Sequence, residues 1–162
     1  MSSIEDIILA CDRRGISKLR KHMPESFCYE AAQLLIDNPG PVIICTGFYI
    51  LRASAPETDG PPGAFFLGQA LETFGYPVTY VTDKYASFLF DGLIPQGRVV
   101  EFPIENVSKS RDFAGRILDR IRPSVVIAIE RCDKTTRGQY LNTNGVDISA
   151  YSAKLDYLIS QH

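Results

Sequence analysis

The chain has 162 residues, of which 45% are hydrophobic, enough to bury the core of one domain. Its 17 basic and 19 acidic side chains are interspersed and give a formal net charge of -2, so it has no basic field that would bind nucleic acid. No apolar run approaches the roughly 20 residues that a membrane-spanning helix needs. We therefore expect a cytoplasmic protein that binds neither nucleic acid nor membrane. The mitochondrial matrix is the alternative location, if a targeting segment has been removed.

Residues 1–38 predict a helical N-terminal segment. Ser3 precedes two acids and an apolar run, a pattern typical of a helix start, and Gly15 is expected to end that helix. A short basic segment at 17–23 and a helix beginning at Pro24 follow, until Asn-Pro-Gly-Pro at 38–41 breaks the chain.

Four cysteines, at positions 11, 28, 45 and 132, show no CxxC spacing and indicate neither a zinc site nor a disulfide framework. We expect reduced, mostly buried thiols. Cys132, in a polar loop, is the one candidate for an exposed thiol, although the default of a buried, unreactive thiol is favoured there too.

From Val42 onward the pattern changes to alternating strands and helices. Near-continuous apolar runs at 42–46, 78–83, 99–103 and 125–130 suit strands that are covered on both faces, and hence a parallel sheet. Helical spacing predicts helices at 63–74, 85–93, 108–121 and 150–160. The expected fold is a Rossmann-like three-layer α/β sandwich with a mostly parallel sheet. It forms one domain over 1–162, with its βα core at 41–162.

A long loop follows the first strand and ends where Gly-Pro-Pro-Gly opens a helix. Loops of this length at the carboxyl end of a strand usually carry a site, and the free N–H groups of a helix N-terminus attract anions. The alternative is that Asp59 only caps the helix and that Pro61 and Pro62 only fix its entry angle. Candidate residues in this region are Thr46, Gly47, Glu57, Thr58, Asp59, Gly60, Gly63 and Ala64.

A second long polar loop covers residues 130–149. It begins with Glu130 and Arg131 at the end of the fourth strand and contains Asn142 and Asp147. A plain solvated surface loop is the alternative. Because ligands collect beyond the carboxyl ends of parallel strands, two long loops on one rim favour a site. GxGxxG after the first strand and GxxxxGK[ST] are both missing, so no nucleotide fingerprint is present.

These two loops resemble those of the D-glutamate cyclase family. The resemblance is carried by CTGFYI (45–50), ETDGPPGA (57–64), FGYPVTYVTD (74–83), IERC (129–132) and GQYLNTNGVDIS (138–149), and spans residues 35–158. The chain departs from the family at Cys132, where proline is common, and at Thr143-Asn144, where Met-Arg is expected. Family members continue into a further glycine-rich segment. We therefore expect this chain to cover the first half of that domain, as a fragment or a short relative.

The resemblance implies dehydrative cyclisation of D-glutamate to 5-oxo-D-proline, and the reverse. This reaction needs a base for the α-amine, donors for an oxyanion and an acid for the departing water. We expect Asp59 and Glu130 to share the acid and base roles, with Glu57 as a third candidate. The expected substrate-binding residues are Thr46, Gly47, Thr58, Gly60, Gly63, Ala64, Arg131, Asn142 and Asp147.

Two alternatives stay open. We expect no cofactor, but Asp59, Glu130 and Asp147 carry oxygen ligands that suit Mg²⁺ or Ca²⁺ as an alternative. The alternative to an enzyme is a non-catalytic module that binds a small anion, or a half-domain or subunit of an oligomer. The expected partner is a small anionic amino acid, and a homo-oligomer is compatible with the sequence.

Overall fold

The computed structural model describes residues 3–12 and 15–162 and divides into two compact units, Met1–Pro39 and Gly40–His162. The first unit contains helices α1 (Ile4–Leu9) and α2 (Phe27–Asp37), with a 3-10 helix, η1 (Ile16–His22), between them. The predicted helix start is confirmed, because the Ser3 hydroxyl accepts the Asp6 N–H at 3.1 Å and completes a capping box. The expected end at Gly15 is wrong. Gly15, at φ 81°, instead opens η1.

Glu5 joins the two helices of the first unit. Its buried carboxylate accepts the backbone N–H of Cys28 at 3.0 Å. Backbone N–H groups, its own and that of Cys28, hold the pKa of Glu5 below its ordinary value.

Cys11 is the exposed thiol of the described residues, whereas burial raises the pKa of the half-buried Cys132. The exposed thiol is therefore Cys11 and not Cys132, the candidate that the sequence offered.

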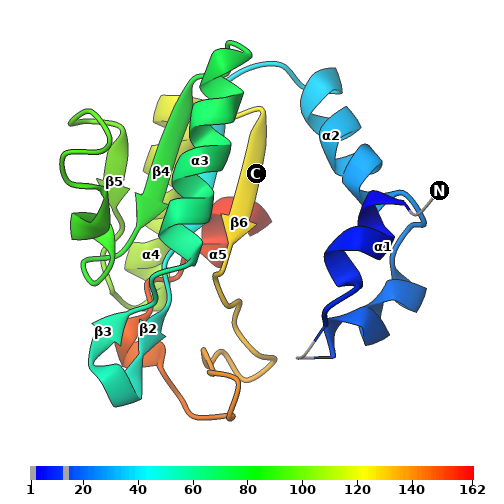
Figure 1. Ribbon diagram of the computed structural model, residues 1–162. Helices are drawn as coiled ribbons and strands as arrows, with labels where there is room; N and C mark the ends of the chain where they lie inside the picture. Colours follow the sequence, from blue (N-terminus) through cyan, green and yellow to red (C-terminus); the bar gives the residue numbers. More distant parts are fainter. Residues whose placement is uncertain (1–2, 13–14) are drawn as a thin grey trace. The chain divides into compact units, whose positions relative to one another are not determined.

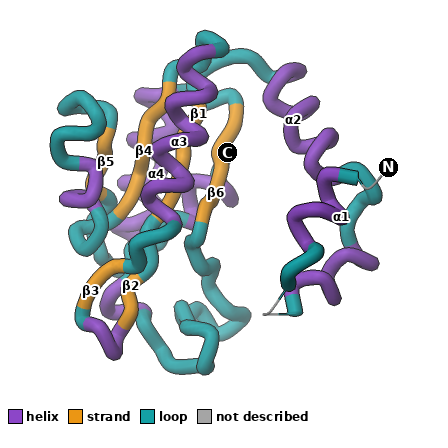
Figure 2. Tube along the Cα trace, in the orientation of Figure 1, coloured by secondary structure: helices purple, strands orange, loops and turns teal. Residues whose placement is uncertain are grey.

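The second unit is built on a four-stranded sheet. Its strands are β1 (Val42–Thr46), β4 (Val78–Thr82), β5 (Val99–Glu101) and β6 (Val125–Ile129). They lie in the order β5-β4-β1-β6, and every pair is parallel (Figure 2). All five residues of the central strand β1 are buried. The predicted α/β fold with a parallel sheet is confirmed.

Helices cover both faces of the sheet, with α3 (Gly60–Thr73) in front and α4 (Val107–Ile121) and α5 (Asp156–Ser160) behind (Figure 1). Tyr80 points toward Gly68 of α3, and its neighbour Val81 packs in the core formed with α4 and α5. Alternate residues of a strand face opposite sides, so this arrangement follows from the pleat.

Two predicted helices are shorter than expected. The segment at 85–93 forms only the 3-10 helix η3 (Ser87–Phe90), because Asp91, at φ -61° and ψ 127°, is already extended. The segment at 150–160 is divided into η4 (Ser149–Tyr151) and α5. Between these, the backbone of Ala153 donates to Asp83 and accepts from Arg131, and neither bond is helical. Tertiary hydrogen bonds therefore interrupt this helix.

Candidate functional site

The strand order locates the most favourable binding position on this sheet. From β1 the chain proceeds to β4 and β5 on one side, and then returns to β6 on the other side of β1. In open α/β sheets, ligands bind outside the carboxyl ends of the strands where the order reverses in this way. That position lies beyond Thr46 and Ile129, which are paired at the ends of β1 and β6.

Gly60, the first residue of α3, closes one side of this crevice. A Cβ atom at Gly60 would lie 2.7 Å from the Cβ of Glu130 and 3.1 Å from Oγ1 of Thr46. Only glycine lets the helix start approach so closely. The first long loop and the end of β6 therefore meet, and Asp59 is attached directly to this contact.

Glu130 adopts a strained backbone conformation at the same point. Its φ of 49° is left-handed, a conformation that costs a non-glycine residue about 1–3 kcal/mol. Such strain gathers at functional sites, where the surrounding structure enforces it.

The carboxylates of Asp59 and Glu130 are available for chemistry. Both residues are exposed. Asp59 occupies the N-cap position of α3, yet its side chain makes no capping hydrogen bond. Simple helix capping therefore does not account for this acid.

Two buried hydroxyls lie at the ends of neighbouring strands. Oγ1 of Thr46 and Oγ1 of Thr82 have no hydrogen-bond partner within the described part of the chain. Gly47, at φ 104°, follows Thr46, and a Cβ there would lie 2.6 Å from Oγ1 of Thr82. Leaving a buried hydroxyl unpaired costs about 1–3 kcal/mol, so these two groups favour a site that receives a polar ligand or water. Thr82 ends an apolar strand just as Thr46 does, but it was not among the predicted site residues.

Arg131 connects the backbone segments around the crevice by hydrogen bonds. Its guanidinium donates to the Gly47 carbonyl at 2.6 Å, to the Asp83 carboxylate at 2.7 Å and to the Ala153 carbonyl at 2.6 Å. The Arg131 and Asp83 side chains are only 4% and 3% exposed. Both terminal nitrogens of Arg131 are thus used inside the protein, where they join the ends of three strands. Its buried Nε has no hydrogen-bond partner in the described part of the chain, so a substrate carboxylate would have to reach a buried N–H group to bind Arg131 as predicted.

Aromatic contacts join the first long loop to η4, which follows the second long loop. The first loop contains a two-stranded antiparallel hairpin, β2 (Tyr49–Ile50) and β3 (Ala55–Pro56), that the sequence did not predict. The Tyr49 ring stacks on Tyr151 of η4, with centroids 4.6 Å apart and planes at 4°. Tyr85, which follows β4, packs against both rings. The hairpin and η4 lie together below the sheet in Figure 1.

The second loop is anchored rather than merely solvated. Tyr140 and Ile148 are buried, and the Tyr140 hydroxyl donates to the buried carboxylate of Asp156. Lys134 donates to the same carboxylate. Burial, followed by the hydrogen bond to Asp156, raises the pKa of Tyr140 far above its ordinary value.

Asn142 and Asp147, both predicted substrate ligands, form turns inside this loop. Oδ1 of Asn142 accepts the N–H groups of Asn144 at 2.9 Å and Val146 at 3.0 Å. Asp147 accepts the N–H of Ser149 at 2.8 Å, and hydrogen bonds from that residue lower the pKa of Asp147. These contacts give both side chains a role in shaping the loop.

The start of α3 offers few backbone donors. Pro61 and Pro62 carry no N–H, and the Gly63 N–H already donates to the Asp59 carbonyl at 3.2 Å. Of the first four helical residues, only Gly60 is left to donate to a ligand. The predicted use of the Gly63 N–H would compete with the helix, and Ala64 is buried.

The remaining candidates lie beside this start. The Glu57 N–H donates to the Phe48 carbonyl at 2.7 Å and closes the hairpin, and Thr58 is exposed. Among the described residues, no three His, Cys, Asp or Glu side chains gather into a group that could hold a metal ion. The arrangement of Asp59, Glu130 and Asp147 thus gives no support to the metal alternative.

Comparison with known proteins identifies one family. The model described as "D-glutamate cyclase-like, C-terminal" matches residues 4–162. The match includes the N-terminal helices, and so extends beyond the resemblance over 35–158. A comparison with curated proteins finds no match. In the described part of the chain, no helix is long and apolar enough to cross a membrane.

Proposed function

The chain belongs to the D-glutamate cyclase-like, C-terminal family, and on this premise we propose that it interconverts D-glutamate and 5-oxo-D-proline. The forward direction is dehydrative ring closure. The observation that carries the proposal is the contact of Gly60 with Glu130 and Thr46, which brings two accessible acids to the switch point of the sheet.

The reaction needs one carboxylate and one carboxylic acid. The α-amine forms a bond to the carbon of the γ-carboxyl group while the base takes the amine proton, and one γ-carboxyl oxygen departs as water after the acid protonates it. Asp59 and Glu130 supply this pair in either order, because the reverse reaction exchanges their roles. Two exposed acids that no cap or ion pair holds within the described part of the chain suit such proton exchange.

Negative charge that develops on the oxygen of the γ-carboxyl group needs hydrogen-bond donors that are already in place. The Thr46 hydroxyl and the Gly60 N–H are the candidates, since both border the Glu130 contact. Removal of one such donor typically lowers kcat by about 10²–10³. Arg131 has a positioning role, because its hydrogen bonds to Gly47 and Asp83 hold the strand ends at fixed positions.

The test is to incubate the purified chain with D-glutamate and measure 5-oxo-D-proline by chiral chromatography and mass spectrometry. Asp59→Asn and Glu130→Gln should each lower kcat by about 10² or more, as expected for general acid–base groups. Asp119→Asn, which changes an exposed acid on α4, is the matched control and should leave kcat unchanged.

Three outcomes separate the alternatives. Turnover that both site variants abolish supports the lyase. Saturable D-glutamate binding without turnover would contradict it and favour a non-catalytic module for small anions. Turnover that persists in both variants would show that these acids are not the catalytic pair.

A further inference from the structure

An apolar cavity of about 390 Å³ lies against the first turns of α3. Its walls include Pro61, Pro62, Phe65 and Phe66 from the helix, and Phe90 and Leu93 from the segment after β4. This volume is within the range of about 300–1,000 Å³ that is typical of small-molecule pockets. Among the residues that the structure describes, no charged side chain lines the cavity, so it suits a neutral, apolar group.

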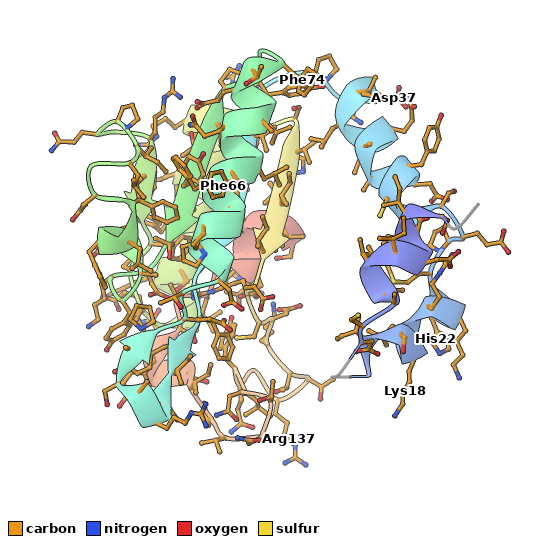
Figure 3. All side chains as sticks on the ribbon, viewed as in Figure 1. Lys18, His22, Asp37, Phe66, Phe74 and Arg137 are labelled. Atoms are coloured by element: carbon orange, nitrogen blue, oxygen red, sulfur yellow. The ribbon has the colours of Figure 1, made fainter. Side chains whose placement is uncertain are left out.

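The cavity has a buried base and an open rim. Phe90 is 2% exposed, whereas Phe66 and Leu93 are 69% and 57% exposed. Figure 3 shows Phe66 on the outward side of α3. Large aromatic side chains left in water beside a preformed apolar hollow are a feature of ligand sites.

The cavity is continuous in sequence with the candidate crevice. Thr58 and Pro61, which line the cavity, flank Asp59 and Gly60, which border the crevice. The apolar surface therefore begins at Pro61, one residue beyond the Gly60 that borders the crevice. D-glutamate carries two carboxylates and has no group to occupy this surface.

From this continuity we propose that the substrates of the site include γ-amides of D-glutamate with an apolar amine, and that the cavity holds the amine. The inference rests on the proposed function, because the ring closure is the same. The α-amine nitrogen forms a bond to the carbonyl carbon of the γ-amide, the bond from that carbon to the amide nitrogen breaks, and the α-amine proton is passed to the departing nitrogen. The products are 5-oxo-D-proline and the free amine, and no other reactant is consumed.

Two amides of similar reactivity and different apolar area test the inference. The γ-benzylamide and the γ-methylamide of D-glutamate are each incubated with the full chain, next to D-glutamate itself, and 5-oxo-D-proline is measured. The benzylamide should show a kcat/KM at least about tenfold above that of the methylamide, since a tenfold ratio corresponds to one modest apolar contact.

Variants of exposed apolar residues test whether the preference for the benzylamide depends on the cavity. Phe66→Ser should raise KM for the benzylamide about fivefold or more and leave D-glutamate conversion unchanged. Phe74→Ser is the matched control, because Phe74 is 79% exposed at the far end of α3 and does not line the cavity (Figure 3). Leu93→Ser, on the opposite wall, provides a second variant that should act like Phe66→Ser.

The outcomes distinguish this inference from the proposed function. Conversion of D-glutamate without preference for the benzylamide, or a preference that Phe66→Ser and Leu93→Ser leave intact, overturns the cavity assignment alone. Cavity-dependent cleavage of the benzylamide without conversion of D-glutamate supports the cavity and refutes dehydration. Failure of all three substrates overturns both.

Discussion

Replacing Arg131 with methionine removes the cation that joins the ends of β1, β4 and β6. The substitution keeps a side chain of similar length but leaves the Asp83 carboxylate, only 3% exposed, without its ion-pair partner at 2.7 Å. The carbonyls of Gly47 and Ala153 lose a donor as well. Asp83 keeps two N–H donors, from Tyr85 and Ala153.

Breaking one side of a buried ion pair costs about 3–5 kcal/mol, because a buried charge is left uncompensated. We expect the free energy of unfolding of Arg131→Met to fall by this amount. For a chain of this size each kcal/mol lowers Tm by about 2–4 °C, so Tm should fall by about 6–20 °C. The double variant Arg131→Met with Asp83→Leu should lose less than the sum of the two single variants.

Urea unfolding followed by circular dichroism measures these differences. The matched control is Lys109→Met, which breaks an exposed pair with Glu105 at 3.2 Å whose side chains are 64% and 40% exposed. That substitution should cost less than about 0.5 kcal/mol. A loss in Arg131→Met no larger than in this control would refute the view that the buried pair holds the strand ends together.

Three further predictions concern packing, thiols and pH. In Gly60→Ala the new Cβ would lie 2.7 Å from the Cβ of Glu130, so the free energy of unfolding should fall by about 1–3 kcal/mol. Gly63→Ala, whose new Cβ would have its nearest contact at 3.9 Å, should cause no such loss. Urea unfolding compares the two variants. Native-state labelling with a thiol reagent at about pH 8 should modify the exposed Cys11 first and spare Cys45, whose pKa burial raises to about 12; equal rates would contradict the fold. The pKa of Asp147 is lowered from 3.8, so its contribution to the loop is complete above that pH and is lost as pH falls through the folded value. An NMR titration of the loop amides should show this acid transition, and Asp147→Asn should remove it.

Much of the candidate site follows from local patterns. An apolar run that ends in threonine predicted the end of β1, and the Gly-Pro-Pro-Gly string predicted a helix start beside it. Both features depend on neighbouring residues only. The bonds of Arg131 are different, because its partner Asp83 is 48 residues away and no periodicity relates the two positions.

The sequence by itself determined the α/β class, the parallel strands and the two loops that carry the candidate acids, because apolar periodicity and glycine-proline breaks act over a few residues. Only the tertiary structure decided that β6 lies beside β1, and with it the position of Glu130 against Gly60. It also divided the last predicted helix, since the backbone of Ala153 is hydrogen-bonded to Asp83 and Arg131. Contacts between distant segments depend on which strands pair, and strand pairing is a property of the whole chain.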